Sequence, residues 1–107
     1  MNGPLSSANR RALLLCFHNH QPVGNFESVL EAATRDAYLP LLGLLSEFPS
    51  VKATIHFSGW LFQWIEERAP ETFSLLKELV SRGQVELLGG GMYEPVLALL
   101  PERDRLG

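Results

Sequence analysis

Apolar and polar residues alternate along the chain in blocks that predict three strands. Residues 12–17 (ALLLCF) form an unbroken apolar run, as expected for a strand that is buried on both faces of a parallel sheet. Residues 52–57 (KATIHF) alternate between small or apolar and polar side chains, which indicates a second strand. Residues 84–88 (QVELL) predict a third strand, which three glycines then interrupt.

Helical spacing of apolar residues fills the segments between these strands. Residues 28–31 (SVLE) have the S-x-x-E spacing of a capping box at the start of a helix. We expect that helix to break before Pro40, because a proline disfavours helical geometry in the residue before it. A second helix is predicted over residues 60–68. A third is predicted from Pro70 to Gly83, since proline suits the first helical position and glycine suits the end.

The order of these elements favours an α/β fold in which helical crossovers join parallel strands. Three such units cannot close a barrel, because a complete eight-unit barrel takes about 250 residues. The sequence therefore predicts either a small open sheet or the front part of a larger protein. The apolar helix stripes and the abrupt end of the sequence favour the larger protein, and the edge of the third strand would need a partner.

Polar residues gather after the strands rather than before them. The segments that lead into the strands carry few side chains suited to ligand binding. The segments at the carboxyl ends of the strands, which we call the strand exits, contain residues 18–21 (HNHQ), 56–60 (HFSGW) and 89–95 (GGGMYEP). Ligands of α/β sheets and barrels bind at the carboxyl ends of the strands. Because all three exits lie at that end, we expect them to converge on one site.

The composition excludes several classes of partner and location. The chain has 107 residues and a net charge of −3, so it has no broad cationic surface for nucleic acid or membrane phosphate. No apolar run approaches the ~20 residues needed to span a bilayer. Cys16 is the single cysteine, which favours a reducing cytoplasm, and its place in an apolar run predicts a core residue.

Each polar residue at the exits also has a purely structural interpretation. His18 and His20 would share one side of an extended segment, where they could bind a ligand or simply bond to carbonyl groups. We expect His56 to be a satisfied core histidine. Trp60 could stack on a sugar ring or anchor the core. Glu94, which we expect to be extended because Pro95 follows it, could accept sugar hydroxyls or be a solvated loop residue.

A metal site is a further interpretation of the same residues. His18, His20, His56 and Glu94 carry the side chains that it would use. Their spacing is not that of a structural zinc site, however, and no cysteine pair supports one. We therefore expect no metal ion in this chain.

Taken together, four segments resemble the N-terminal part of glycoside hydrolase family 57. They are HNHQPVGNF (18–26), HFSGWLFQWIEE (56–67), GQVELLGGGMYEP (83–95) and LLPERDRLG (99–107). The first contains the His-Gln-Pro core of the family's first motif, and the third corresponds to its second motif. The resemblance covers residues 12–107, and the order and separation of the two motifs make it specific.

The resemblance implies an incomplete, seven-unit (β/α) barrel that acts on α-glucans or maltooligosaccharides, as 4-α-glucanotransferases and α-amylases do. It implies a retaining mechanism without a cofactor, in which the Glu nucleophile and the Asp acid/base lie beyond Gly107. We accordingly expect a disordered tail over residues 1–11. Residues 12–107 would form a truncated N-terminal portion of the barrel, inactive without the missing C-terminal part.

By the same resemblance, His20 lines the subsite of the reacting glucose and Glu94 helps to shape that subsite. Gln21, Trp60 and His18 are weaker candidates for substrate contacts. Two alternatives remain open. One is a non-catalytic carbohydrate-binding or degenerate module. The other is a metal-dependent deacetylase-like or mannosidase-like domain, which the missing Asp at the first strand's exit argues against.

Overall fold

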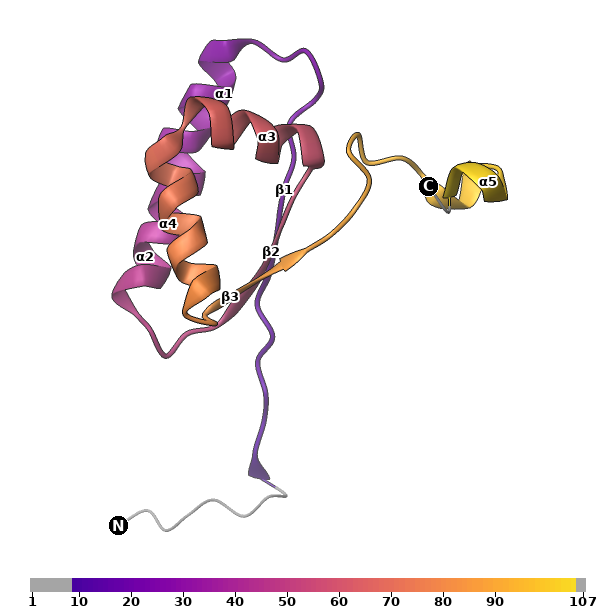
Figure 1. The fold of residues 1–107 in the computed structure, drawn as a ribbon. Coiled ribbons are helices and arrows are strands. Elements are labelled where there is room, and N and C mark those ends of the chain that lie inside the picture. Colours follow the sequence, from indigo (N-terminus) through magenta and orange to yellow (C-terminus); the bar gives the residue numbers. More distant parts are fainter. Residues whose placement is uncertain (1–8, 106–107) are drawn as a thin grey trace, which may run out of the picture.

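A three-stranded parallel sheet forms the centre of the computed structural model, which describes residues 9–105. The strands are β1 (Cys16–Asn19), β2 (Ala53–Phe57) and β3 (Val85–Leu88), and they lie in the order β1-β2-β3. Both pairs are parallel, so the polypeptide crosses over between them through helices (Figure 1). The predicted α/β class with parallel strands and helical crossovers is confirmed.

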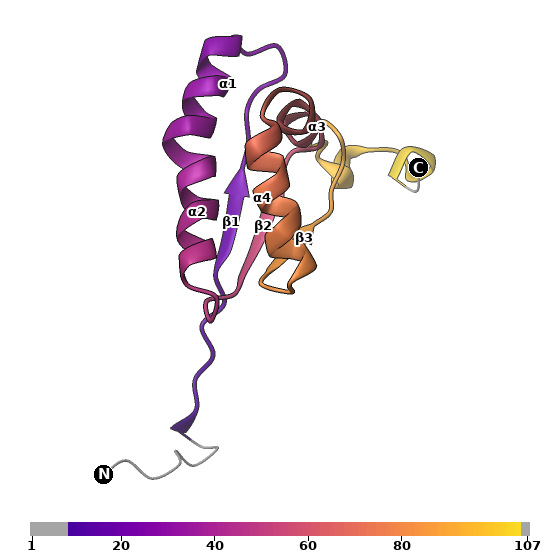
Figure 2. The same cartoon turned by 60° about the vertical axis from the view of Figure 1, so that its left-hand side comes forward.

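All of the long helices lie on one face of this sheet (Figures 1 and 2). They are α1 (Glu27–Ala33), α2 (Leu39–Glu47), α3 (Gly59–Arg68) and α4 (Pro70–Ser81). The core lies between them and the sheet, and its most deeply buried side chains are Leu30, Leu42, Ile55, Leu61, Ile65, Leu76 and Leu79. The opposite face of the sheet is not covered by any described helix.

The first strand is shorter and more exposed than its sequence predicts. It begins at Cys16, and Leu13 and Leu14 before it are 82% and 90% exposed. Cys16 is exposed as well, so its assignment to the core was wrong. The physical reason is position, because β1 lies at an edge of the sheet and helices cover only one of its faces. Residues 1–8 of the predicted tail lie outside the described residues.

Helix α1 does not use the predicted capping box. Its N-cap residue is Phe26, and no side chain caps the first turn. The helix therefore begins before Ser28, which lies inside the first turn. Upstream of it, the Asn25 side chain accepts a hydrogen bond from the Phe26 N–H at 2.9 Å. This local bond fixes the entry of the chain into the helix.

The predicted break of the first helical segment before Pro40 does not occur. The π-helical segment Thr34–Tyr38 follows α1, and α2 continues directly from it with Pro40 in its first turn. Leu39 donates its N–H to Thr34 O, five residues earlier. The wider turn accommodates a residue that has no N–H to donate, so the helical rod runs on without a break.

Helix α4 ends as predicted, at a glycine in the left-handed conformation. Gly83 has a φ of +74°. Its N–H donates to Val80 O, and the Gln84 N–H donates to Leu79 O, each at 3.0 Å. This pair of bonds is the Schellman motif, which satisfies the last carbonyls of the helix. It turns the chain directly into β3.

The buried side chain of Gln84 ties this turn to the loop between α2 and β2. Its Nε2 group donates to the carbonyl oxygens of Leu45, Phe48 and Val51 at 2.5 to 3.0 Å. Arg82 in turn donates to Gln84 Oε1 at 2.9 Å. The sequence does not reveal this role, because the loop carbonyls belong to residues more than thirty positions away.

The described C-terminal segment leads away from the sheet (Figure 1). It contains a 3-10 turn, Leu97–Leu99, and the short helix α5 (Glu102–Arg105). The radius of gyration is 17.3 Å, against about 13 Å for a compact domain of this length. The value is larger because the described segments before β1 and after β3 lead away from the sheet (Figure 1). Within residues 9–105, no helix has the length and apolar character that crossing a membrane requires.

Candidate functional site

Strand register places the exit histidines of β1 and β2 side by side. His18 pairs with His56, and His56 pairs with Leu88 of β3. Along β2 the buried side chains are Ala53, Ile55 and Phe57, so the alternate residues Thr54 and His56 face the side without helices. The prediction that His56 is a core histidine was wrong. Alternation along the strand points its ring out of the core and toward the exits.

Three imidazole rings stack at the carboxyl ends of these strands. The His18 and His56 ring centroids lie 4.9 Å apart with 11° between their planes, and the His18 and His20 centroids lie 6.1 Å apart with 7°. His18 Nδ1 and His56 Nδ1 are 2.8 Å apart, a hydrogen bond in which one nitrogen donates and the other accepts. The stack therefore joins two strands that are far apart in the sequence.

The carboxylate of Glu94 closes this group. Its Oε1 lies 3.5 Å from His18 Nε2 and 3.6 Å from His56 Nδ1, and its Oε2 forms a close ion-pair contact with His20 Nδ1. The side chains of Glu94 and His56 are 22% and 15% exposed, so the centre of the group is partly shielded from water. We call His18, His20, His56 and Glu94 the His–Glu cluster.

Because a proline follows Glu94, we expected its backbone to be extended, and this prediction was wrong. Its φ is +52°, in the left-handed region that non-glycine residues seldom adopt. The Glu94 N–H donates to Gly91 O at 3.3 Å, so the residue closes a turn. This turn directs the carboxylate toward the histidines. Local strain of this kind often occurs at binding sites.

Close backbone packing fixes the loop that carries Glu94. The Trp60 N–H at the start of α3 donates to Met92 O at 3.1 Å. A Cβ atom on Gly59 would lie 2.7 Å from Met92 Cα, so no larger residue fits there without moving the loop. Gly90 is close as well, because a Cβ on it would lie 3.1 Å from His56 Nε2. Glycines at these positions therefore bring the loop against α3 and the cluster.

Gln21 and Trp60 use their polar groups inside the protein. Trp60 Nε1 donates to Gln21 O at 2.7 Å, and Gln21 Nε2 donates to Tyr38 Oη at 3.0 Å. Asn25 donates to Gln21 Oε1 at 2.9 Å. These bonds hold the loop after β1 against α3 and the π-helical segment. A sugar contact through either side chain stays a prediction.

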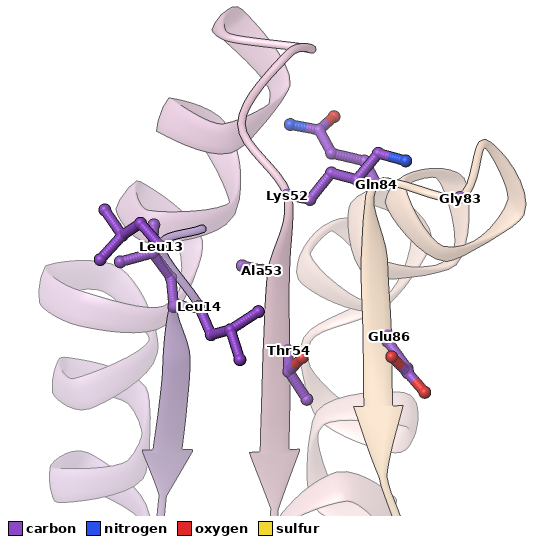
Figure 3. A pocket seen from close by; sticks show the side chains of 9 residues that line it. Leu13, Leu14, Lys52, Ala53, Thr54, Gly83, Gln84 and Glu86 are labelled. Carbon is purple, nitrogen blue, oxygen red and sulfur yellow. The ribbon is translucent and has the colours of Figure 1, made fainter. Parts of the chain in front are cut away.

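A hollow at the opposite, amino end of the sheet is chemically poorer (Figure 3). Its ionisable lining residues are Lys52 and Glu86, which lie well apart in Figure 3. The other lining residues are Leu13, Leu14, Leu15, Ala53, Thr54, Gly83 and Gln84. Within the described residues, three or more histidine, cysteine or acidic side chains come together only at the carboxyl end of the sheet, so the His–Glu cluster is the candidate site.

The cluster can do two kinds of chemistry. Imidazole nitrogens and a carboxylate can form hydrogen bonds with the hydroxyl groups of a ligand, as donors and acceptors. The same atoms can bind a metal ion, and His18, His20 and Glu94 each offer a ligand atom within 4.8 Å of the others. The sequence analysis grouped all four residues in its metal-site interpretation, but it expected His56 to be a core histidine rather than part of a sugar site.

Comparisons with known proteins agree on one family. The model of glycosyl hydrolase family 57 matches residues 14–106. An α-amylase of Pyrococcus abyssi is 54% identical and a 4-α-glucanotransferase of Thermococcus litoralis is 52% identical, each over 89 residues that make up 83% of this chain. The crystal structure of 4-α-glucanotransferase from Thermococcus litoralis superposes with a TM-score of 0.82 at 49% identity, over 87% of this chain and 15% of that one. The chain spans 14% of the length of these two curated relatives.

Proposed function

The chain belongs to glycosyl hydrolase family 57, and from this membership we propose that it forms the first part of the catalytic barrel of an α-glucan-active enzyme. Its three parallel strands with helical crossovers correspond to an N-terminal portion of the family's seven-unit barrel. Further strands would continue the sheet from the edge of β3. We also propose that the nucleophile Glu and the acid/base Asp lie beyond Gly107, and that the enzyme works in the cytoplasm.

The convergence of three imidazoles on one carboxylate carries this proposal. The His–Glu cluster lies at the carboxyl ends of parallel strands, which is the catalytic end of (β/α) barrels. Retaining glycoside hydrolysis needs two carboxyl groups about 5 Å apart. Within residues 9–105, Glu94 is the single carboxylate of the cluster. The cluster therefore binds the sugar, and the reacting carboxyl groups come from elsewhere.

The roles within the site follow from the atoms that each residue offers. Glu94 accepts hydrogen bonds from glucose hydroxyls, and its contact with His20 orients the carboxylate toward the open face. His20 and His18 are the more exposed rings and contact the sugar directly. Gln21 and Trp60 act mainly by holding the loop after β1 in place.

The variants His20→Ala and Glu94→Gln, each made in the complete protein that the gene encodes, test this function. We expect each variant to lower turnover of maltooligosaccharides by about 100-fold or more, the usual loss when a preorganised polar contact is removed. Glu66→Gln, an exposed change on α3, is the matched control and should leave turnover unchanged. Near-normal activity of His20→Ala would contradict the role of that residue. Binding of maltooligosaccharides without any product by the unsubstituted protein would favour a non-catalytic module instead.

A further inference from the structure

Tyr38 is a buried residue whose hydroxyl group bonds to the loop after β1. Its side chain is 6% exposed, and its ring meets the Phe57 ring edge-on, with 5.8 Å between the centroids. The hydroxyl accepts a hydrogen bond from Gln21 Nε2 at 3.0 Å, as a buried tyrosine hydroxyl needs a polar partner. Gln21 directly follows His20, whose ring contacts the Glu94 carboxylate. The bond therefore joins the helices that cover the sheet to the loop that carries His20.

The other polar groups of the Gln21 side chain and carbonyl are also bonded within the protein. Gln21 Oε1 accepts from Asn25 Nδ2 at 2.9 Å, and the Gln21 carbonyl accepts from Trp60 Nε1 at 2.7 Å. Asn25 belongs to the same loop, so the anchors from outside the loop are Trp60 and Tyr38. Trp60 of α3 holds the backbone, whereas Tyr38 holds the side chain.

The π-helical segment Thr34–Tyr38 determines where this hydroxyl lies. Four buried residues repeat every four positions along the helical rod, namely Leu30, Thr34, Tyr38 and Leu42. A regular α-helix turns about 100° per residue, so each step of four residues would overshoot a full turn by about 40°. A π-helical turn holds more residues and takes up part of this overshoot. The segment therefore keeps Tyr38 on the buried face, within reach of Gln21.

We propose that Tyr38 is a positioning residue of the sugar site, which acts through Gln21 to hold His20 where it contacts glucose. This inference rests on the proposed function and deepens it. Without the hydroxyl, the Gln21 amide loses its partner among the helices, and the loop is free to shift relative to Glu94. A shift of about 1 Å in a group that acts on substrate can lower turnover about 100-fold.

The test removes one hydroxyl at a time from the complete protein that the gene encodes. Tyr38→Phe keeps the ring against Phe57 and removes the bond to Gln21. We expect kcat for maltooligosaccharides to fall about 10-fold to 100-fold while KM changes less than about 3-fold, because the sugar-binding atoms remain and only their placement changes.

Thr34→Val is the matched control. It removes another buried hydroxyl of the same π-helical segment, which donates to Leu30 O at 2.8 Å and does not contact the loop. It should leave kcat and KM unchanged. A Tyr38→Phe variant with the turnover of the unsubstituted protein overturns the proposal, and so does a Thr34→Val variant that loses as much kcat as Tyr38→Phe.

Gln21→Met tests the same connection from the side of the loop and serves if Tyr38→Phe does not fold. If Tyr38 acts through Gln21, the double variant Tyr38→Phe/Gln21→Met should lose no more kcat than Gln21→Met alone. Losses that multiply would mean that the two residues act separately, which contradicts the proposal. Unchanged turnover in Gln21→Met would contradict it as well.

A readout that needs no turnover separates this inference from the proposed function. In protein that carries isotope-labelled histidine, nuclear magnetic resonance records the His20 ring, identified by its loss in His20→Gln. The His20 signals should shift or broaden in Tyr38→Phe and stay in place in Thr34→Val. If they do so but the unsubstituted protein does not act on maltooligosaccharides, the proposed function alone fails. If that protein is active but the His20 signals do not respond to Tyr38→Phe, this inference alone fails.

Discussion

The two ends of the sheet use polar side chains in opposite ways. At the amino end, the buried amide of Gln84 donates to one carbonyl of α2 and two of the loop that follows it, and its oxygen accepts from Arg82. At the carboxyl end, the side chains of His18 and His20 are 59% and 44% exposed. Both rings contact the carboxylate of Glu94. The amino end thus stabilises the fold, whereas the carboxyl end is free to bind a ligand.

Replacement of Gln84 should give the largest loss of stability. Gln84→Leu removes the donor to the carbonyls of Leu45, Phe48 and Val51, and we expect it to lower the free energy of unfolding by about 2–3 kcal/mol. Urea denaturation measures the change. Gln63→Leu, at an exposed position of α3, is the control and should shift stability by less than about 0.5 kcal/mol. A Gln84 variant as stable as this control would show that the amino end is not the stabilising one.

Gly59→Ala should affect both stability and the site. The new Cβ meets the Met92 backbone at 2.7 Å, so the loop that carries Glu94 must move. We expect a loss of about 1–2 kcal/mol in unfolding free energy together with weaker ligand binding at the cluster. Gly43→Ala, on α2 with open space around it, should instead stabilise the protein by about 0.5–1 kcal/mol. If both variants behave alike, the close approach at Gly59 does not position the loop.

Glu94→Gly should separate binding from stability. Glycine relieves the positive φ of this position, which offsets the loss of a partly exposed ion pair. We expect the unfolding free energy to change by less than about 1 kcal/mol while turnover of maltooligosaccharides is lost. A loss of stability larger than that of Gly59→Ala would mean that the cluster holds the fold together.

The smallest effect is expected at Asp36, which lies on the surface of the π-helical segment. A hydrogen bond from the Arg35 guanidinium lowers the pKa of the Asp36 carboxyl. A lowered pKa in the folded state adds stability above the pKa of the unfolded chain, and that stability is lost as pH falls through the folded value. Because the pair is fully exposed, we expect Asp36→Asn to leave the melting temperature unchanged at pH 7 and at pH 3. Calorimetry at both pH values checks this.

The parts of the fold that local chemistry determines could be predicted from the sequence. The second and third strands, the helix from Pro70 and its glycine stop all appear where expected, because their signals lie within a few residues of one another. The convergence of the strand exits also followed, since parallel strands bring their carboxyl ends to the same edge. His18, His20 and Glu94 do meet there.

The errors arose where distant contacts decide the outcome. We predicted that Leu13 and Leu14 are buried, but their burial depends on what covers the second face of the sheet. His56 read as core because its neighbours are buried, whereas its own side chain follows the alternation of β2 to the other face. We predicted an extended backbone at Glu94, but its turn depends on hydrogen bonds made by the whole loop. The cover over Leu13 and Leu14 and the turn at Glu94 leave no local mark in the sequence, whereas the alternation that turns His56 outward is visible over residues 52–57.

The free edge of the sheet at β3 affects how residues 9–105 behave in concentrated solution. Within residues 9–105, β3 lies at an edge where its backbone groups have no neighbouring strand on one side, and Leu87 and Leu88 on it are exposed. Such an edge is a template for strands of other molecules. Residues 9–105 by themselves should therefore self-associate as concentration rises, and a single charged residue in place of Leu88 should raise their solubility.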